Sequence, residues 1–148
     1  QVLRGIPDHA EHGCVLTIGN FDGVHRGHQA LLARLAAKAW ETGLPAVVLT
    51  FEPHPREYFT HEVRPVRLTS LREKVGLLEQ HGVDRIVIGR FNARFAALSA
   101  EAFIEDVLIH GLGVRHLLIG DDFRFGRGRE RTVQMEGKVL SITVPDRA

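Results

Sequence analysis

The chain contains four short runs of apolar residues, each of which is nearly continuous. The runs are Cys14–Gly19, Ala46–Phe51, Arg85–Gly89 and His116–Gly120. A strand that is buried on both faces loses the alternation of polar and apolar positions and becomes such a run. We therefore predict that these four runs are strands of a parallel sheet covered by helices.

The segments between the runs have helical spacing. Residues 27–42 form the first of these segments, and Gly43 is the residue expected to end its helix. One face of this helix carries its apolar residues, which are Leu31, Leu32, Leu35, Ala36 and Ala39. A helix with one apolar face is expected to pack that face against the sheet.

Capping residues predict two further helices. Ser70 and Glu73 have the spacing of a capping box, and Gly82 is the expected end of the helix that they open. This helix turns three apolar residues inward, namely Leu71, Val75 and Leu78. Ser99 can cap a third helix that runs to Ile109. The apolar residues of the third helix are Phe103, Ile104, Val107 and Leu108.

Strands and helices alternate along the chain, with about 30–40 residues in each unit. This alternation predicts right-handed βαβ units and an α/β fold of the Rossmann-like, doubly wound type, with helices on both faces of a parallel sheet. The 148 residues fit one domain, residues 1–148. Sheets of this type bind ligands at the carboxyl ends of their strands.

Composition narrows the classes of partner. The chain has one cysteine, Cys14, so it cannot form an internal disulfide, which suits a reducing, cytoplasmic location. A net charge of +1 gives no reason to expect a nucleic-acid partner. No apolar run approaches the roughly 20 residues that span a bilayer, so no membrane segment is expected.

The segment Gly19–Gln29 follows the first predicted strand and leads into the first predicted helix. Unpaired N–H groups and the helix dipole make the start of such a helix a site for an anion. His25 and His28 are three residues apart and can share one face of the first turn. Gly27 between them allows a ligand to approach the backbone closely.

Standard phosphate-binding motifs, G-x-G-x-x-G and G-x-x-x-x-G-K-[ST], do not occur here. His25-Arg26-Gly27-His28 instead matches the H-x-G-H signature of the nucleotidylyltransferase superfamily, in which an NTP α-phosphate is attacked and pyrophosphate leaves. Two imidazoles at a helix start can donate charge-assisted hydrogen bonds to the phosphate oxygens. Two alternatives stay open: histidines without a role, and two ligands of a zinc site.

The resemblance extends along the chain and is to the prokaryotic FAD synthetases. Gly19–Gln29 resembles the opening motif of that family, and Thr50–Pro55 resembles its T-F-x-P-H-P loop. Two further stretches are similar to family segments, Leu68–Lys74 and Phe95–Phe103. Gly120–Gly126 resembles the family's G-x-D-F-x-F-G loop. The resemblance covers roughly residues 14–129 and implies a nucleotidylyltransferase fold.

The resemblance also implies roles for individual residues. The catalytic residues would be His25 and His28. The residues implied at ATP are Gly19, Asn20, Phe21, Asp22, Gly23, His25, Gly27, His28, Ser141 and Thr143. Those implied at the flavin are Phe51, Pro53, His54, Pro55, Asp122, Phe123, Arg124 and Phe125. No protein ligand of a metal is implied, because Mg²⁺ would accompany ATP on its phosphates.

Simpler structural explanations exist for three of these segments. Pro53–Pro55 also fits a stiff turn, and the alternation of Phe123 and Phe125 also fits an ordinary strand edge. Arg124–Arg131 also fits a solvated loop.

After Arg129 the chain departs from the family pattern, which continues with a helix and an S-S-T-x-x-R segment. Ser141 and Thr143 are candidate remnants of that segment, but its arginine is not at the expected place. Two explanations stay open. In the first, a loop is missing from the sequence between Arg129 and Ser141, and the residues on either side of it are numbered continuously. In the second, the protein has a real deletion there, which affects the ATP site.

The expected activity is transfer of AMP from ATP to FMN, which gives FAD and pyrophosphate. A riboflavin kinase domain, which the family usually carries, is not expected within residues 1–148. One alternative is a related nucleotidylyltransferase that acts on phosphopantetheine or nicotinate mononucleotide. The other alternative is a non-catalytic module that binds a nucleotide or a flavin.

Overall fold

A computed structural model describes residues 1–21, 26–52, 71–120, 123–125, 131–133 and 140–143. For Arg26 and for the strands beyond Gly120, only the backbone is described.

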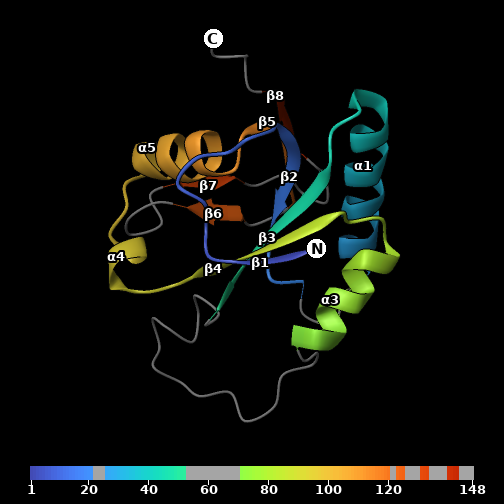
Figure 1. Ribbon diagram of the computed structural model, residues 1–148, viewed down its shortest axis with the longest axis horizontal. Helices are drawn as coiled ribbons and strands as arrows, with labels where there is room; N and C mark the ends of the chain where they lie inside the picture. Colours follow the sequence, from blue (N-terminus) through green and yellow to red (C-terminus); the bar gives the residue numbers. More distant parts are fainter. Residues whose placement is uncertain (22–25, 53–70, 121–122, 126–130, 134–139, 144–148) are drawn as a thin grey trace.

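The centre of the molecule is a sheet of six strands in the order β1-β4-β3-β2-β5-β8 (Figure 1). The strands are β1 (Val2–Arg4), β2 (Cys14–Ile18), β3 (Ala46–Glu52), β4 (Arg85–Arg90), β5 (Val114–Ile119) and β8 (Leu140–Thr143). All neighbours are parallel except β8, which runs antiparallel to β5. The four predicted strands and their parallel pairing are thus confirmed. The short edge strands β1 and β8 were not predicted.

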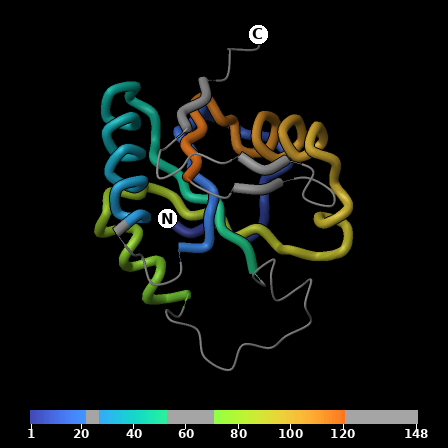
Figure 2. The backbone as a smooth tube through the Cα atoms, turned by 180° about the vertical axis from the view of Figure 1, so that it is seen from behind, coloured from blue at the N-terminus to red at the C-terminus, as the bar shows by residue number. Residues whose placement is uncertain are grey.

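Helices cover both faces of the sheet, as Figures 1 and 2 show from opposite sides. On one face lie α1 (Arg26–Thr42) and α3 (Leu71–Gln80). On the other lie the short α4 (Ala93–Ala96) and a continuous helix made of α5 (Ala100–Ala102) and η1 (Phe103–Gly111). This arrangement confirms the predicted doubly wound α/β fold.

Two apolar layers hold the helices to the sheet. Along β2, Val15 belongs to the layer under α1 and α3, whereas Leu16 belongs to the layer under η1. Val48 and Leu49 divide in the same way along β3. Because successive strand residues point to opposite faces, a strand that serves both layers must be apolar at nearly every position. This explains the unbroken apolar runs in the sequence.

The helix ends follow the predicted local signals. Gly43 and Gly82 have φ values of +71° and +90°, a left-handed conformation that glycine adopts without strain. The Ser99 hydroxyl accepts a hydrogen bond from the Ala102 N–H at 3.1 Å, so Ser99 is the predicted cap. From Phe103 onward the helix is wound as a π-helix, which the sequence did not predict. The Ser70 cap lies outside the described residues.

Residues 123–125 and 131–133 form a separate two-stranded antiparallel sheet, β6 (Phe123–Phe125) with β7 (Arg131–Val133). The backbone over Phe123–Phe125 is therefore a strand, as the strand-edge explanation anticipated. This pairing fixes the backbone but does not assign a role to the side chains.

The strand order reverses direction once, and this determines where a ligand can bind. The chain proceeds from β2 to β3 to β4 on one side of β2, and β5 then pairs with the opposite edge of β2. The crevice at such a reversal, outside the carboxyl ends of the strands, is where open α/β sheets bind ligands. In this chain it lies between the ends of β2 and β5.

The buried Cys14 thiol provides a test of the core. Its Sγ donates a hydrogen bond to the Leu112 carbonyl at 3.3 Å, and burial raises the pKa of the thiol to about 12, against a weaker opposing effect of Arg85. Because the thiolate is the reactive form, Ellman's reagent at pH 8 should modify native Cys14 on the order of 10²–10³-fold more slowly than the unfolded chain. Equal rates in buffer and in guanidinium chloride would contradict the buried position.

Candidate functional site

The turn after β2 is shaped by one close contact. The Gly19 N–H donates to the Leu49 carbonyl at 3.1 Å and so extends the pairing of β2 with β3. A Cβ at Gly19 would lie 2.9 Å from Cε2 of Phe21, so a larger residue would displace that ring. Phe21 itself is 2% exposed and has φ +53°, a conformation that is costly for a bulky residue. Its burial stabilises this strained turn.

His28 lies directly against this turn, in the first turn of α1. The rings of His28 and Phe21 have centroids 5.0 Å apart and an interplanar angle of 57°. The first turn of α1 contains no acidic residue, so no carboxylate of its own neutralises the positive end of the helix dipole. The start of α1, at the strand-order reversal, can therefore accept an anion beside His28.

The structure describes only part of the predicted nucleotide loop. Gly19, Asn20 and Phe21 lie in the turn at the end of β2. Gly27 is exposed beside His28 on α1. Asp22, Gly23 and His25 lie outside the described residues. The described residues thus bring His28 against Phe21, a turn residue that the resemblance implies at ATP. The pairing of His28 with His25 stays a prediction.

Aromatic side chains gather at the carboxyl ends of β3 and β4. The ring of Phe51 is 5.8 Å from that of Phe91 and 5.1 Å from that of Phe95, measured between centroids. Phe91 and Phe95 are 5.5 Å apart, and Phe103 contacts Phe95 at 5.9 Å. The first three rings are only half-buried, so this group offers flat apolar surface at the edge of the sheet that carries His28.

Phe51 was predicted at the flavin, whereas Phe91 and Phe95 were not. The sequence could have indicated Phe91, because it directly follows β4 and Phe51 lies near the end of β3. Since β3 and β4 are adjacent and parallel, both residues lie at the same edge of the sheet. Pro53, His54 and Pro55 lie outside the described residues, as does Asp122. For Phe123, Arg124 and Phe125 the structure gives the backbone of β6 alone.

Ser141 and Thr143, which were predicted at ATP, both lie on β8. Ser141 is in register with Leu118 and Thr143 with His116. Because β8 is antiparallel to β5, the chain leads away from the carboxyl edge of the sheet as it passes from Ser141 to Thr143. Of the two residues, Ser141 is the nearer in register to the edge that carries His28.

His116 lies toward the opposite edge of the sheet. Its pKa is lowered by partial burial and by the nearby positive charges of Lys38 and Arg115, against a weaker opposing effect of Glu41. The neutral imidazole is therefore favoured at this position near neutral pH. His116 is in register with Val15 on β2, away from the end of that strand where the turn at Gly19 begins.

Among the described residues, no group of three or more His, Cys, Asp or Glu residues is arranged to hold a metal ion. Within the same ranges, no helix has the length and apolar character required to cross a membrane.

The chain is similar in sequence and in fold to known proteins. A bifunctional riboflavin kinase/FMN adenylyltransferase from Escherichia coli is 52% identical over 133 residues, which are 88% of this chain and 42% of that protein. The protein of the same name from Haemophilus influenzae is 47% identical over 137 residues, covering 91% and 44%. The chain thus spans less than half the length of these curated relatives.

A crystal structure described as a macrolide-efflux protein from Streptococcus pneumoniae has a TM-score of 0.77 to this chain at 27% identity. The match covers 89% of this chain and 46% of that one. The family model for FAD synthetase matches residues 8–143. Since these residues make up most of the sequence, the chain belongs to the FAD synthetase family.

Proposed function

We propose that this chain transfers AMP from ATP to FMN and thereby forms FAD and pyrophosphate. The observation that carries the proposal is the position of His28, in the first turn of α1 at the strand-order reversal and beside a glycine turn. A helix start at this point is suited to a phosphate chain. The names of the relatives that match most of the chain supply the acceptor, FMN.

The reaction requires charge stabilisation more than proton transfer. A phosphate oxygen of FMN attacks the α-phosphorus of ATP, a new P–O bond forms, and the bond to pyrophosphate breaks with its electrons leaving on pyrophosphate. Hydrogen bonds from His28, from His25 and from the first N–H groups of α1 would stabilise the charge that develops on these oxygens. No covalent intermediate with the enzyme is required.

The acceptor would bind on the aromatic side of the same edge. An isoalloxazine ring needs flat apolar surface, and Phe51, Phe91 and Phe95 offer it at the ends of β3 and β4. We propose that the residues implied by the family resemblance also contact the flavin. These residues are Pro53, His54, Pro55, Asp122, Phe123, Arg124 and Phe125. Arg124, Arg127 or Arg129 would supply a cation for the FMN phosphate.

Mg²⁺ would accompany ATP, where it would offset the negative charge of the phosphates and need few protein ligands. The names of the relatives support a riboflavin kinase in the longer protein. The single cysteine of the sequence, the buried and free Cys14, suits a reducing, cytoplasmic location.

The Streptococcus pneumoniae structure is described as a macrolide-efflux protein, and that description would support a different activity. Its identity to this chain is 27%, whereas the adenylyltransferase relatives reach 52% over a similar share of the chain. The closer similarity favours adenylyl transfer.

The direct test is the reaction itself. The purified chain, incubated with ATP, Mg²⁺ and FMN, should form FAD and pyrophosphate, which chromatography with fluorescence detection and a pyrophosphate assay would follow. Phosphopantetheine and nicotinate mononucleotide should not replace FMN. Faster turnover of either one would favour the alternative nucleotidylyltransferase, and flavin binding without turnover would favour the non-catalytic module.

His28→Ala should lower kcat by about 10²–10³-fold, because it removes one donor to the charge of the transition state. Circular dichroism should show an unchanged fold, since His28 is only half-buried. His12→Ala is the matched control, because His12 is exposed just before β2 at the opposite end of that strand. A kcat equal to that of the unmutated chain would remove His28 from the mechanism.

Phe51→Leu should weaken FMN binding while ATP binding stays nearly constant. Leucine keeps apolar volume but loses the flat ring, and an aromatic contact contributes about 0.5–1.5 kcal/mol beyond its area, or roughly two- to tenfold in Kd. Calorimetry with each ligand separately would measure this. Loss of ATP affinity with retained FMN affinity would show that the two half-sites are assigned the wrong way round.

A further inference from the structure

Two threonines in the middle of the sheet are completely buried. Thr17 on β2 and Thr50 on β3 both have 0% exposure. They alternate with residues of the η1 layer, so both point into the layer under α1 and α3, as Val15 and Val48 do.

The surroundings of both hydroxyls are largely apolar. Thr17 is in register with Val48 on one side and with Leu118 on the other. Thr50 is in register with Ile88 of β4. All three of these neighbours belong to the buried core under α1 and α3.

Thr50 also lies beside the nucleotide turn. The Gly19 N–H bonds to the carbonyl of Leu49, the residue directly before Thr50, so the turn begins next to this threonine. Asn20 follows in the turn, and its Oδ1 atom is buried.

These three polar atoms share one property. Among the residues that the structure describes, none forms a hydrogen bond with Thr17 Oγ1, Thr50 Oγ1 or Asn20 Oδ1. A buried polar group without a partner is costly, and native proteins commonly satisfy such groups with an ordered water. The three atoms lie toward the carboxyl ends of two adjacent strands.

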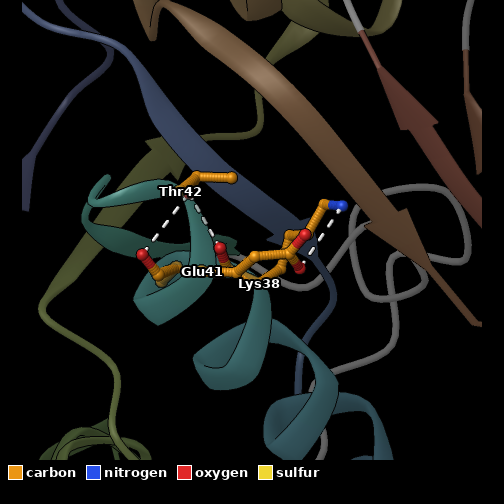
Figure 3. Close-up of polar contacts among 4 residues, drawn as sticks. Lys38, Glu41 and Thr42 are labelled. Atoms are coloured by element: carbon orange, nitrogen blue, oxygen red, sulfur yellow. Dashed lines mark hydrogen bonds and ion pairs between the residues drawn. The ribbon is translucent and has the colours of Figure 1, made fainter.

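Thr42 shows how a threonine hydroxyl is satisfied elsewhere in this chain (Figure 3). Its Oγ1 donates to the Lys38 carbonyl at 2.8 Å, one turn earlier in α1. A strand offers no carbonyl of its own at that position, because its carbonyls point along the sheet to neighbouring strands. Thr17 and Thr50 therefore need a partner from outside their strands.

We propose that Thr17 and Thr50 share a buried water beneath the nucleotide turn and that the two threonines are positioning residues for His28. Two hydroxyls meet the minimum of two polar partners that a buried water uses. Thr17 and Thr50 are diagonal neighbours on one face of two parallel strands. Their Cα atoms are roughly 8 Å apart, a span that two hydroxyls and one water can bridge.

The water would act on the site through the turn. A bond to Thr50 restrains β3 next to Leu49, whose carbonyl accepts the hydrogen bond of Gly19. Gly19 lies close to the ring of Phe21, and Phe21 packs against the ring of His28. The effect on catalysis rests on the proposed function, because it requires His28 to act on the nucleotide. The water itself does not depend on that function.

Kinetics with isosteric variants test the positioning role. Thr17→Val and Thr50→Val keep the shape and remove the hydroxyl, and each should lower kcat about tenfold, within the 10²-fold that an ångström of misplacement can cost. Thr17→Ser and Thr50→Ser should retain kcat. Thr42→Val is the matched control, which removes a satisfied hydroxyl from the far end of α1 and should leave kcat unchanged.

Two kinetic results would overturn the positioning role. An unchanged kcat in both valine variants, together with a raised Tm, would show that the hydroxyls have no partner and destabilise the core. Removing a buried polar group that has no hydrogen-bond partner is neutral or stabilising. A loss of kcat in the serine variants equal to that in the valine variants would trace the effect to side-chain shape.

Diffraction from the unmutated chain at about 1.5 Å tests the water independently of activity and of how the variants fold. Density for a water within about 3 Å of Thr17 Oγ1 and Thr50 Oγ1 is expected. A protein side chain in that position, or two hydroxyls without a common partner, would overturn the proposal. If the chain makes no FAD but the water is present, the proposed function fails and the water site stands.

Discussion

The confinement of β2 on all four sides is the constraint on which the rest of the structure depends. β3 and β5 pair with its two edges, and apolar layers cover both of its faces. All five of its residues are buried. A shift of one residue in register would exchange the two sets of side chains between the layers, so the register is strongly specified. The carboxyl end of β2 is thereby fixed in space.

The candidate site uses this fixed end. Gly19 continues the pairing with β3, and Phe21 adopts a left-handed conformation that its burial helps to stabilise. The same ring supports His28, so one aromatic residue serves the core and the site together. Catalytic groups are positioned most accurately when packing holds the residues behind them, and Phe21 has that place here.

The nucleotide side of the site could be predicted because one continuous segment encodes it. A strand, a glycine turn and a helix start follow each other from Cys14 to His28, and local patterns reveal each of them. The aromatic group could be predicted only in part, since Phe91 and Phe95 meet Phe51 through the pairing of β3 with β4. Motif reasoning assigned Ser141 and Thr143 to ATP but could not place them on an antiparallel edge strand.

The sequence by itself determined the four buried strands, the helices that connect them and the residues that end or cap those helices. These features depend on local periodicity and on single residues such as Gly43 and Ser99. Only the tertiary structure decided the strand order, the edge strands β1 and β8, and the meeting of Thr17 with Thr50 in one layer. Strand pairing joins residues that are distant in the chain. Its energy depends on the side chains that pack against each strand, and local sequence patterns do not identify those side chains.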